Sequence, residues 1–165
     1  MVYKCESVYT KASAAVIHLS SKRKREFKKK MSSHSGSFGG SGGSKFNDDI
    51  VGIRGMKIRH GNQVDSIQVT YILADGTIWE GPRHGGTGGS LSQFTLEEGE
   101  KLVKMEGKTN NALVDQLTFH SNKGKKYGPY GKTGQTSFSV EGELVTFFGS
   151  AGNLLDAISV RYNPL

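Results

Sequence analysis

The sequence predicts an all-β fold in which three similar units share one core around a pseudo-threefold axis. Two loop motifs that each occur three times, and the alternation of apolar and polar residues after one of them, lead to this prediction. Helical periodicity is hard to find beyond residue 31, and the nearest candidate, LEEGEKLVKM, is interrupted by Gly99. A three-sheet prism suits three equal units better than an open sandwich, because it leaves no long sheet edge unprotected.

The first motif is a short loop that ends in an aspartate. It reads GNQVDSIQVTY at 61–71, NALVDQLTF at 111–119 and GNLLDAISVRY at 152–162. Apolar residues then alternate with polar ones, which predicts β-strands with one buried face and a well-fixed register. The predicted buried residues are Ile67, Val69 and Tyr71, then Leu117 and Phe119, then Ile158, Val160 and Tyr162. The polar residues between them, such as Ser66, Thr118 and Ser159, are expected on the opposite face.

The second motif is a glycine-rich loop that leads into a strand. It reads GGSGGSKF at 39–46, GGTGGSLSQF at 85–94 and GKTGQTSF at 131–138. Spacings of 46 and 45 residues make Gly43, Gly89 and Gly134 equivalent. Recurrence of both motifs at about 45 residues indicates three structural units. Between the first two, LADGTIW at 73–79 carries an Asp-Gly pair that predicts a hairpin turn.

The charge is unevenly distributed. The net charge of +7 is carried by residues 1–30, which hold nine Lys or Arg and two Asp or Glu, and the remainder is balanced. Repulsion within KRKREFKKK at 22–30 predicts a disordered basic arm. A nuclear-localisation or nucleic-acid-binding arm, or attraction to an anionic surface, is the alternative. Residues 31–165 are expected to form the functional domain, entered through a Ser/Gly-rich stretch.

Several classes of function are excluded or disfavoured. The single Cys5 excludes an internal disulfide framework and a cysteine-rich zinc site, and we expect no metal and no cofactor. No apolar run approaches the roughly 18 residues of a membrane span. No signal peptide is visible, so we expect a cytoplasmic protein, or a nuclear one through the arm, with secretion left open. GPYGKTG is not a phosphate loop, because Lys126 stands where the first glycine is required. Each aspartate loop offers one carboxylate, whereas a glycosidase needs two.

The aspartate loops favour a binding function. In the loop from Gly152 to Asp156, the glycine predicts a tight turn with positive φ that leaves the following N–H groups free. A fixed carboxylate beside free amides can accept hydrogen bonds from two hydroxyls and donate to a third oxygen, which suits a sugar. An aspartate that merely closes a turn onto its own backbone is the alternative for one copy. Three copies, each with a glycine-rich loop, favour the sugar site.

Over residues 36–165 the sequence resembles the jacalin-related lectins, through GGSGGSKFNDD, NKGKKYGPYGKTG and FFGSAGNLLDAISV in that order. The resemblance implies a β-prism of three four-stranded antiparallel Greek-key sheets, no catalysis, and a sugar site between the first glycine-rich loop and the last aspartate loop. It assigns N–H donors to Gly43, Asn153 and Leu154 beside Gly152, and an acceptor of the 4- and 6-hydroxyls to Asp156. Asn47 departs from the family, whose members usually carry aspartate there, and this affects loop bracing.

The resemblance also implies further sites at the equivalent loops. The second comprises Gly61, Asn62, Gln63, Asp65, Gly88 and Gly89, and a possible third comprises Asn111, Ala112, Leu113, Asp115 and Gly134. In the third, Asn111 stands where glycine belongs, although asparagine tolerates positive φ. In the resembled family, galactose binding is associated with proteolytic release of the first-loop glycine as a new N-terminus and with a stacking aromatic. Here Gly43 lies within an uninterrupted chain and Thr109, Asn110 and Asn111 supply no aromatic, so the resemblance implies mannose- or glucose-type glycans. We expect two sugar sites per chain and a homo-oligomer, a dimer formed through an outer sheet.

A different class of ligand is the alternative. Lys123, Lys125, Lys126 and Lys132 could form a basic patch for sulfated or other anionic glycans, as the resemblance to animal members suggests. Binding through these lysines, or nucleic-acid binding through the arm, would weaken steeply with salt, whereas mannose binding through Asp156 would not. Nucleic acid is not the expected partner, since the predicted domain is electrically neutral.

Overall fold

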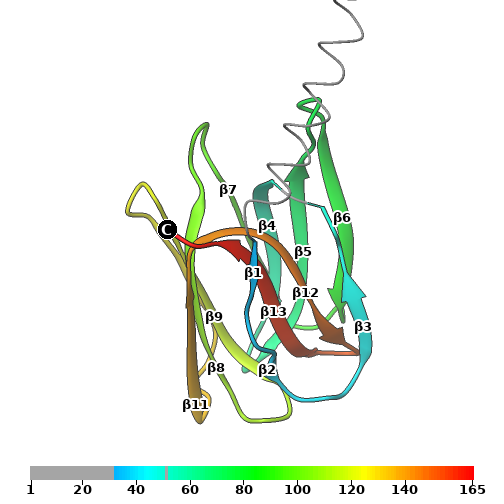
Figure 1. Cartoon of the computed structure of the whole chain (residues 1–165). Helices are drawn as coiled ribbons and strands as arrows, with labels where there is room; N and C mark the ends of the chain where they lie inside the picture. The colour runs from blue at the N-terminus through cyan, green and yellow to red at the C-terminus, as the bar shows by residue number, and fades with distance from the viewer. Residues whose placement is uncertain (1–31, 51) are drawn as a thin grey trace, which may run out of the picture. The chain divides into compact units, whose positions relative to one another are not determined.

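The computed structural model in Figure 1 describes residues 32–50 and 52–165. The basic arm predicted at residues 1–30 lies outside the described residues, and the account below concerns the unit formed by Ser33–Leu165. Its strands are β1 (Ser33–His34), β2 (Phe38–Gly39), β3 (Ser44–Asn47), β4 (Ile53–His60), β5 (Val64–Ile72), β6 (Ile78–Gly85), β7 (Ser90–Thr95), β8 (Leu102–Thr109), β9 (Val114–Ser121), β10 (Lys126–Gly131), β11 (Thr136–Glu141), β12 (Glu143–Ala151) and β13 (Leu155–Asn163). The described part has no helix long and apolar enough to cross a membrane.

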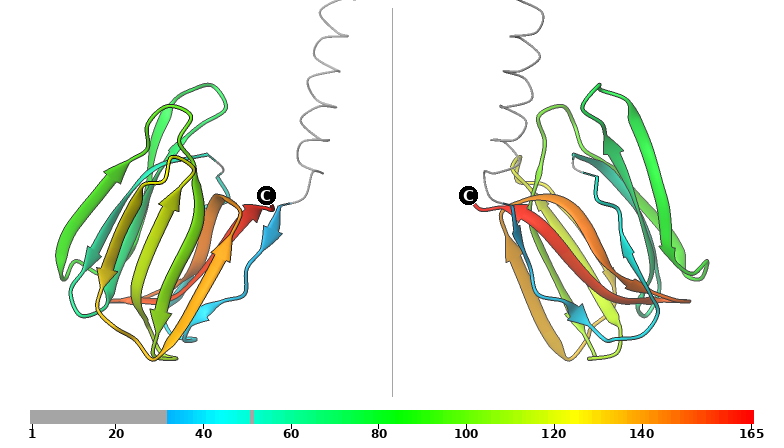
Figure 2. Two further views of the ribbon diagram at one scale, coloured as in Figure 1. Left: turned by 90° about the vertical axis from the view of Figure 1, so that its left-hand side faces the viewer. Right: turned by 45° about the vertical axis from the view of Figure 1, so that its right-hand side comes forward.

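These strands form three antiparallel sheets that face a common centre (Figures 1 and 2). Two have the orders β6-β5-β4-β7 and β10-β9-β8-β11, in which three consecutive strands are joined by hairpins and the fourth returns beside the first, as in a Greek key. The remaining sheet, β1-β13-β12-β3, has the same order, but its outer strand is split into β1 and β2, which both pair with β13. The predicted all-β prism of three four-stranded Greek-key sheets is confirmed, with this split outer strand as a departure from it.

The core lies where the three sheets meet, and each sheet contributes one phenylalanine to its centre. The ring of Phe119 on β9 lies 6.0 Å from that of Phe94 on β7 and 5.9 Å from that of Phe147 on β12. Rings at this separation pack favourably beyond the area that they bury. The apolar residues predicted after each aspartate are buried here, except that Tyr162 is partly buried at the margin.

Three polar residues of the same strands are less exposed than expected. Ser66, Thr118 and Ser159 were expected on a solvent-facing side, but all three are buried. They lie on β5, β9 and β13, which are central strands with a neighbour on each side. Small hydroxyl side chains between two flanking strands are covered by the larger side chains beside them, so alternation alone overestimates their exposure.

The hairpin predicted at residues 73–79 forms as expected. Leu73 N–H donates to Thr77 O at 2.8 Å, and Gly76 takes the positive φ of 84° that an Asp-Gly turn requires. The candidate helix around Gly99 does not form. Gly99 has a φ of 71° in a turn, and the chain enters β8 three residues later.

Candidate carbohydrate-binding sites

The three glycine-rich loops and the three aspartate loops meet at one end of the prism, the lower end in Figure 1. Each glycine-rich loop begins with a glycine at positive φ, namely Gly39, Gly85 and Gly131. A Cβ on these residues would lie 2.1, 2.1 and 2.0 Å from the carbonyl oxygens of Asp156, Asp65 and Asp115 respectively. Only glycine permits so close an approach, and it sets each glycine-rich loop directly over its aspartate.

The loops of neighbouring units also contact one another and so close a ring. A Cβ on Gly86 would lie 2.2 Å from Asn153 O, and one on Gly40 would lie 2.4 Å from Ala112 O. The third contact is a hydrogen bond, in which Lys132 N–H donates to Asn62 O at 3.1 Å. Each aspartate loop is therefore fixed between two glycine-rich loops, its own and that of the next unit.

The structure corrects the correspondence between the glycines of the three loops. A Cβ on Gly42, Gly88 or Gly134 would lie 2.4 to 2.6 Å from a carboxylate oxygen of its own aspartate, so these three positions are equivalent. Gly43 and Gly89 follow at φ of 71° and 65°. The third loop has Gln135 at that place, outside the positive-φ region. The predicted match of Gly134 with Gly43 and Gly89 was therefore wrong by one residue, because it rested on counting glycines.

In the first site the structure brings together the residues that the sequence analysis named. The Asp156 carboxylate is partly exposed below Gly42 and Gly43, and Gly152 and Asn153 are exposed beside it. Gly152 N–H donates to Leu154 O at 3.0 Å and closes the loop. The N–H groups of Asn153 and Leu154 have no hydrogen-bond partner within residues 32–50 and 52–165. A carboxylate and two available amides thus lie side by side at the surface.

Gly152 serves this site differently from what was expected. Neither Gly152 nor Gly61 has a φ in the positive region, so the tight left-handed turn predicted for them is wrong. A Cβ on Gly152 would lie 3.7 Å from Asp156 Oδ2, and one on Gly61 would meet nothing within 4 Å. The glycines therefore leave open space beside the carboxylate rather than relieve backbone strain.

The second site repeats the first, with an additional brace. Asp65 is partly exposed below Gly88 and Gly89, and Gly61 N–H donates to Gln63 O at 3.0 Å. The N–H groups of Asn62 and Gln63 have no hydrogen-bond partner in the described chain. The sequence analysis missed Arg59, whose Nη1 donates to the carbonyls of Thr87, Gly88 and Gly89 at 3.1, 3.5 and 3.2 Å. Because Arg59 holds these carbonyls, the backbone of the second glycine-rich loop is fixed over Asp65.

The third site differs because its polar groups bond to one another. Asp115 is only 4% exposed, and its Oδ1 accepts hydrogen bonds from Asn110 Nδ2 at 2.9 Å and Gln63 Nε2 at 3.4 Å. Asn110 Oδ1 accepts from the N–H groups of Ala112 and Leu113, both at 3.0 Å. The two amides that remain available in the first two sites are occupied here by Asn110, and Asp115 Oδ1 is occupied by Asn110 and Gln63, whereas the buried Asp115 Oδ2 has no hydrogen-bond partner among the described residues.

His84 does not line the second site. Its Nε2 lies 2.6 Å from Asp48 Oδ1, and its ring stacks on Phe46 with centroids 3.9 Å apart. The Tyr71 hydroxyl donates to the other carboxylate oxygen of Asp48, whose side chain is 1% exposed. Asp48 follows β3, which leaves the first glycine-rich loop, and His84 precedes the second. This buried contact therefore joins the bases of the two loops.

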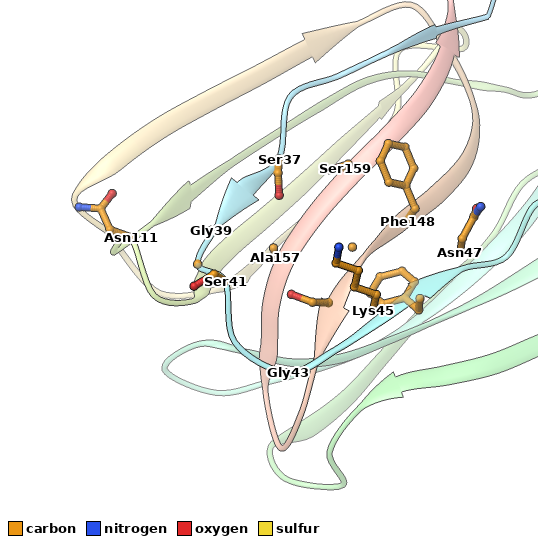
Figure 3. Close-up of a pocket in the computed structure, with 14 residues that line it drawn as sticks. Ser37, Gly39, Ser41, Gly43, Lys45, Asn47, Asn111, Phe148, Ala157 and Ser159 are labelled. Atoms are coloured by element: carbon orange, nitrogen blue, oxygen red, sulfur yellow. The ribbon is translucent and has the colours of Figure 1, made fainter.

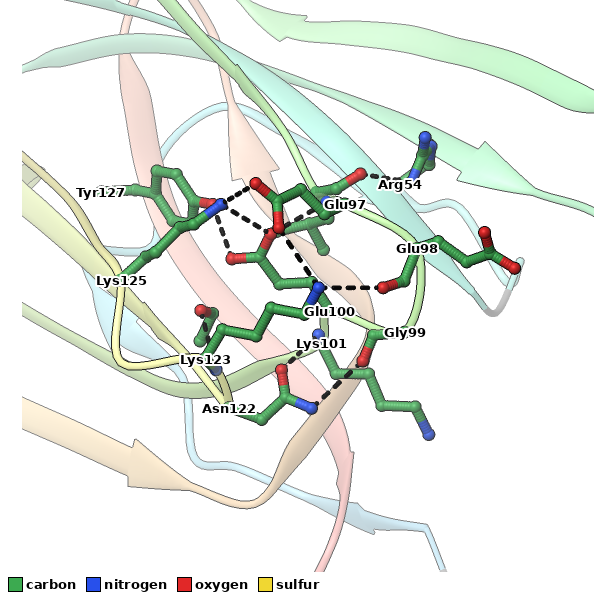
Figure 4. A network of polar contacts seen from close by, with 12 residues as sticks. Arg54, Glu97, Glu98, Gly99, Glu100, Lys101, Asn122, Lys123, Lys125 and Tyr127 are labelled. Carbon is green, nitrogen blue, oxygen red and sulfur yellow. Dashed lines mark hydrogen bonds and ion pairs between the residues drawn. The ribbon is translucent and has the colours of Figure 1, made fainter.

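The four lysines of the predicted basic patch do not gather in one place. Lys123 and Lys125 lie in the turn before β10, and each Nζ pairs with Glu97, at 3.2 and 2.5 Å (Figure 4). Lys126 begins β10, and Lys132 follows its far end, six residues or roughly 20 Å away. Two of the four charges are thus compensated by Glu97 and Glu100 together, and Lys132 belongs to the ring of loops instead.

The same network holds Glu100, whose side chain is fully buried (Figure 4). Burial by itself would raise the pKa of Glu100, but hydrogen bonds from the Glu97 amide, from Ser121 and from Tyr127, together with the Lys125 charge, outweigh it. The pKa of Glu100 is therefore lowered to about 2. Burial and the Glu100 carboxylate raise the pKa of the Tyr127 hydroxyl to about 12. This network lies at the end of the prism away from the loops and stabilises the fold.

A groove of about 970 Å³ lies beside the first glycine-rich loop, on the outer face of β12 and β13 (Figure 3). Lys45, Phe148 and Ser159 are among its lining residues, and it shares Gly43 with the first site. Asp156 does not line it, so the groove adjoins the first site without including its carboxylate. The described residues contain no cluster of three or more His, Cys, Asp or Glu able to hold a metal.

A β-prism with paired glycine-rich and aspartate loops has the features expected of a carbohydrate-binding protein, and comparison with known proteins agrees. The family described as the jacalin-like lectin domain matches residues 35–161. Griffithsin from Griffithsia sp. (strain Q66D336) is 34% identical over 127 residues, covering 76% of this chain and 93% of Griffithsin. Zymogen granule membrane protein 16 from Rattus norvegicus is 34% identical over 142 residues, covering 80% of this chain and 81% of its own.

A solved structure gives the same result. A mannose-specific jacalin-related lectin from Morus nigra, in complex with mannose, is 34% identical with a TM-score of 0.74, covering 81% of this chain and 95% of that one. The chain belongs to the jacalin-like lectin family. It is a carbohydrate-binding lectin with mannose-binding relatives, and its family is non-catalytic.

Proposed function

We propose that the protein binds mannose- or glucose-type glycans through two sites per chain, one at Asp156 and one at Asp65. The observation that carries the proposal is that both loops place a partly exposed carboxylate beside two amides without a partner in the described chain. This arrangement offers both acceptors and donors to vicinal hydroxyls. The mannose-bound relative from Morus nigra supports the choice of sugar.

The expected affinity for one sugar is weak. A few hydrogen bonds on an open surface, each contributing about 0.5–1.5 kcal/mol net, suggest a Kd on the order of 1 mM, or about −4 kcal/mol. Two sites that engage neighbouring branches of one glycan would raise the apparent affinity through a high effective concentration. Self-association through an outer sheet stays a prediction, and sedimentation analysis measures it directly.

Isothermal titration with methyl α-mannoside tests the proposal through three matched substitutions. Asp156→Asn and Asp65→Asn each keep the side-chain volume but remove the charge, so each should lower the stoichiometry from two to one. Asp115→Asn is the control, since that aspartate is buried among internal partners, and it should leave two sites. Methyl α-galactoside should bind more weakly. A wild-type protein that gives no heat with mannoside, or variants that all keep two sites, would refute the proposal.

The salt dependence of binding separates this proposal from binding through the basic residues. Counterion release makes lysine-mediated binding to a polyanion fall steeply between 50 and 200 mM salt. Hydrogen bonding of a neutral sugar to Asp156 lacks that dependence. The pairing of Lys123 and Lys125 with Glu97 disfavours the polyanion alternative.

A further inference from the structure

The loop between β8 and β9 is one residue longer than its two counterparts. In the strand pairing, His60 lies opposite Val64 and Ala151 opposite Leu155, so three residues connect each pair. Thr109 lies opposite Val114, which leaves four residues between them. The extra residue is not evident from the sequence. The aspartate lies four residues after Gly61 and Gly152, and it lies four residues after Asn111 too, so the three motifs look equal in length.

The closing hydrogen bonds show which residue is extra. Gly61 N–H donates to Gln63 O and Gly152 N–H to Leu154 O, and the corresponding bond in the third loop runs from Asn110 N–H to Leu113 O at 3.4 Å. Asn110, not Asn111, therefore takes the place of the glycine. Asn111 is the inserted residue, with a φ of 69° that asparagine tolerates better than most residues do.

The side chain of Asn110 bonds to both amides and to one carboxylate oxygen that remain available in the other two loops, and Asp115 Oδ2 alone is left without a partner in the described chain. Its Oδ1 accepts from the amides of Ala112 and Leu113, which correspond to those of Asn153 and Leu154. Its Nδ2 donates to Asp115. One oxygen that accepts from two amides, next to a donor that reaches the carboxylate, is the pattern that a sugar ring would present to an open loop.

The first loop indicates why a side chain at this position closes a site. A Cβ on Gly152 would lie 3.7 Å from Asp156 Oδ2 and 3.8 Å from Gly43 Cα, so its direction is towards the carboxylate. In the third loop the same position carries an asparagine, and its amide reaches Asp115. The amide of Gln135, which stands where the other loops have Gly43 and Gly89, is also engaged, since it donates to Thr109 O at 3.0 Å.

We propose that Asn110 is an internal ligand that closes the third loop, and that the residue at this position, glycine or asparagine, decides whether a loop of this chain binds sugar. The inference rests on the proposed function, because it explains why the chain has two open sites rather than three. It also explains why Asp115 is buried while Asp65 and Asp156 are partly exposed.

Transfer of the two asparagines of the third loop into the first loop tests the inference. Replacement of Gly152 by the dipeptide Asn-Asn reproduces the length and the asparagine of the third loop in the first. With methyl α-mannoside, the stoichiometry should fall from two to one. The same replacement at Gly61 should close the other site, and the double replacement should abolish binding. The reverse change, a single glycine in place of Asn110 and Asn111 together with Gln135→Gly, should raise the stoichiometry to three.

Amide hydrogen exchange supplies a readout that needs no sugar. In the wild-type protein the amides of Ala112 and Leu113 should exchange more slowly than those of Asn153 and Leu154, and Asn110→Ala should speed their exchange about tenfold. Unchanged exchange in that variant would overturn the internal contact. Three sites in the wild-type protein, or two sites after the dipeptide replacement at Gly152, would overturn the proposal that the residue at this position decides whether a loop binds sugar. A wild-type protein with the expected exchange pattern but no mannoside binding would refute the proposed function and leave the contact standing.

Discussion

Removal of the Tyr71 hydroxyl tests how the bases of the first and second glycine-rich loops are held together. Tyr71 is fully buried and donates to Asp48, whose side chain is 1% exposed and also pairs with His84. Tyr71→Phe removes the hydroxyl alone and keeps the ring, which stacks against Trp79 at 6.1 Å. The substitution therefore removes the hydrogen bond to the Asp48 carboxylate, together with the weaker contacts of the hydroxyl with Thr146 and the Phe147 backbone.

The expected cost follows from the charge of the acceptor. Hydrogen bonds to charged groups contribute about 1.5–3 kcal/mol, and Asp48 keeps His84, so we expect the free energy of unfolding to fall by about 2 kcal/mol. For a domain of this size that corresponds to a decrease in Tm of roughly 6–12 °C. Urea denaturation followed through the fluorescence of Trp79, the single tryptophan, measures the change.

A matched control and a pH series make the result decisive. Tyr130 is also buried, but its hydroxyl has no hydrogen-bond partner in the described chain, so Tyr130→Phe should change the free energy of unfolding by less than about 0.5 kcal/mol. Burial, and then the Asp48 carboxylate, raise the pKa of Tyr71 above its usual value of 10. The unfolded chain releases this proton near pH 10 while the folded chain retains it, so the wild-type protein loses stability above pH 10. The Tyr71→Phe variant should lose less stability than the wild type above pH 10. Equal losses in the two phenylalanine variants, or identical alkaline profiles for the wild type and Tyr71→Phe, would refute the reasoning.

Three further predictions concern other parts of the molecule. Arg59→Ala frees the carbonyls of the second glycine-rich loop and should weaken mannoside binding at that site about fivefold, with the first site unchanged in a site-resolved NMR titration. Gly43→Ala should abolish binding at the first site by the same titration, since a Cβ there would lie 2.5 Å from the Ala151 carbonyl carbon at a φ of 71°. Glu100 has its pKa lowered to about 2, so its stabilising effect is complete above pH 4.5 and is lost as the pH falls towards 2. Glu100→Gln should therefore be less stable than the wild type in urea at pH 7, with a smaller further loss at pH 3.

The strands after the three aspartates, β5, β9 and β13, were predictable because their apolar residues alternate with polar ones. A slip by one residue would expose residues such as Ile67 and Val160, and the sequence tolerates only one register. The grouping of Asp156 with the first glycine-rich loop was predictable only through the resemblance, since the two motifs lie at opposite ends of the domain. The prism brings them together because β3 pairs with β12.

The loop details were not predictable, for two physical reasons. The sequence does not indicate where in a loop an extra residue lies. Asn111 was expected at the place of the glycine, but it is the inserted residue, and Asn110 takes that place. Glycine is also ambiguous, because it serves both positive φ and open space. At Gly152 the second use applies and the first was assumed. The contact of Tyr71 with Asp48 joins residues 23 positions apart, which no local pattern indicates.

The ring of contacts among the loops has a consequence for what one molecule can join. The three aspartate loops lie at the same end of the prism, and so do the two proposed sites at Asp65 and Asp156 (Figure 1). Under the two-site proposal, one protein molecule would hold two arms of a single branched oligosaccharide, or two oligosaccharides on one coated surface. Bridging two separate particles requires a second copy whose loop end points the other way, so agglutination would report on self-assembly and not on the number of sugars bound per chain.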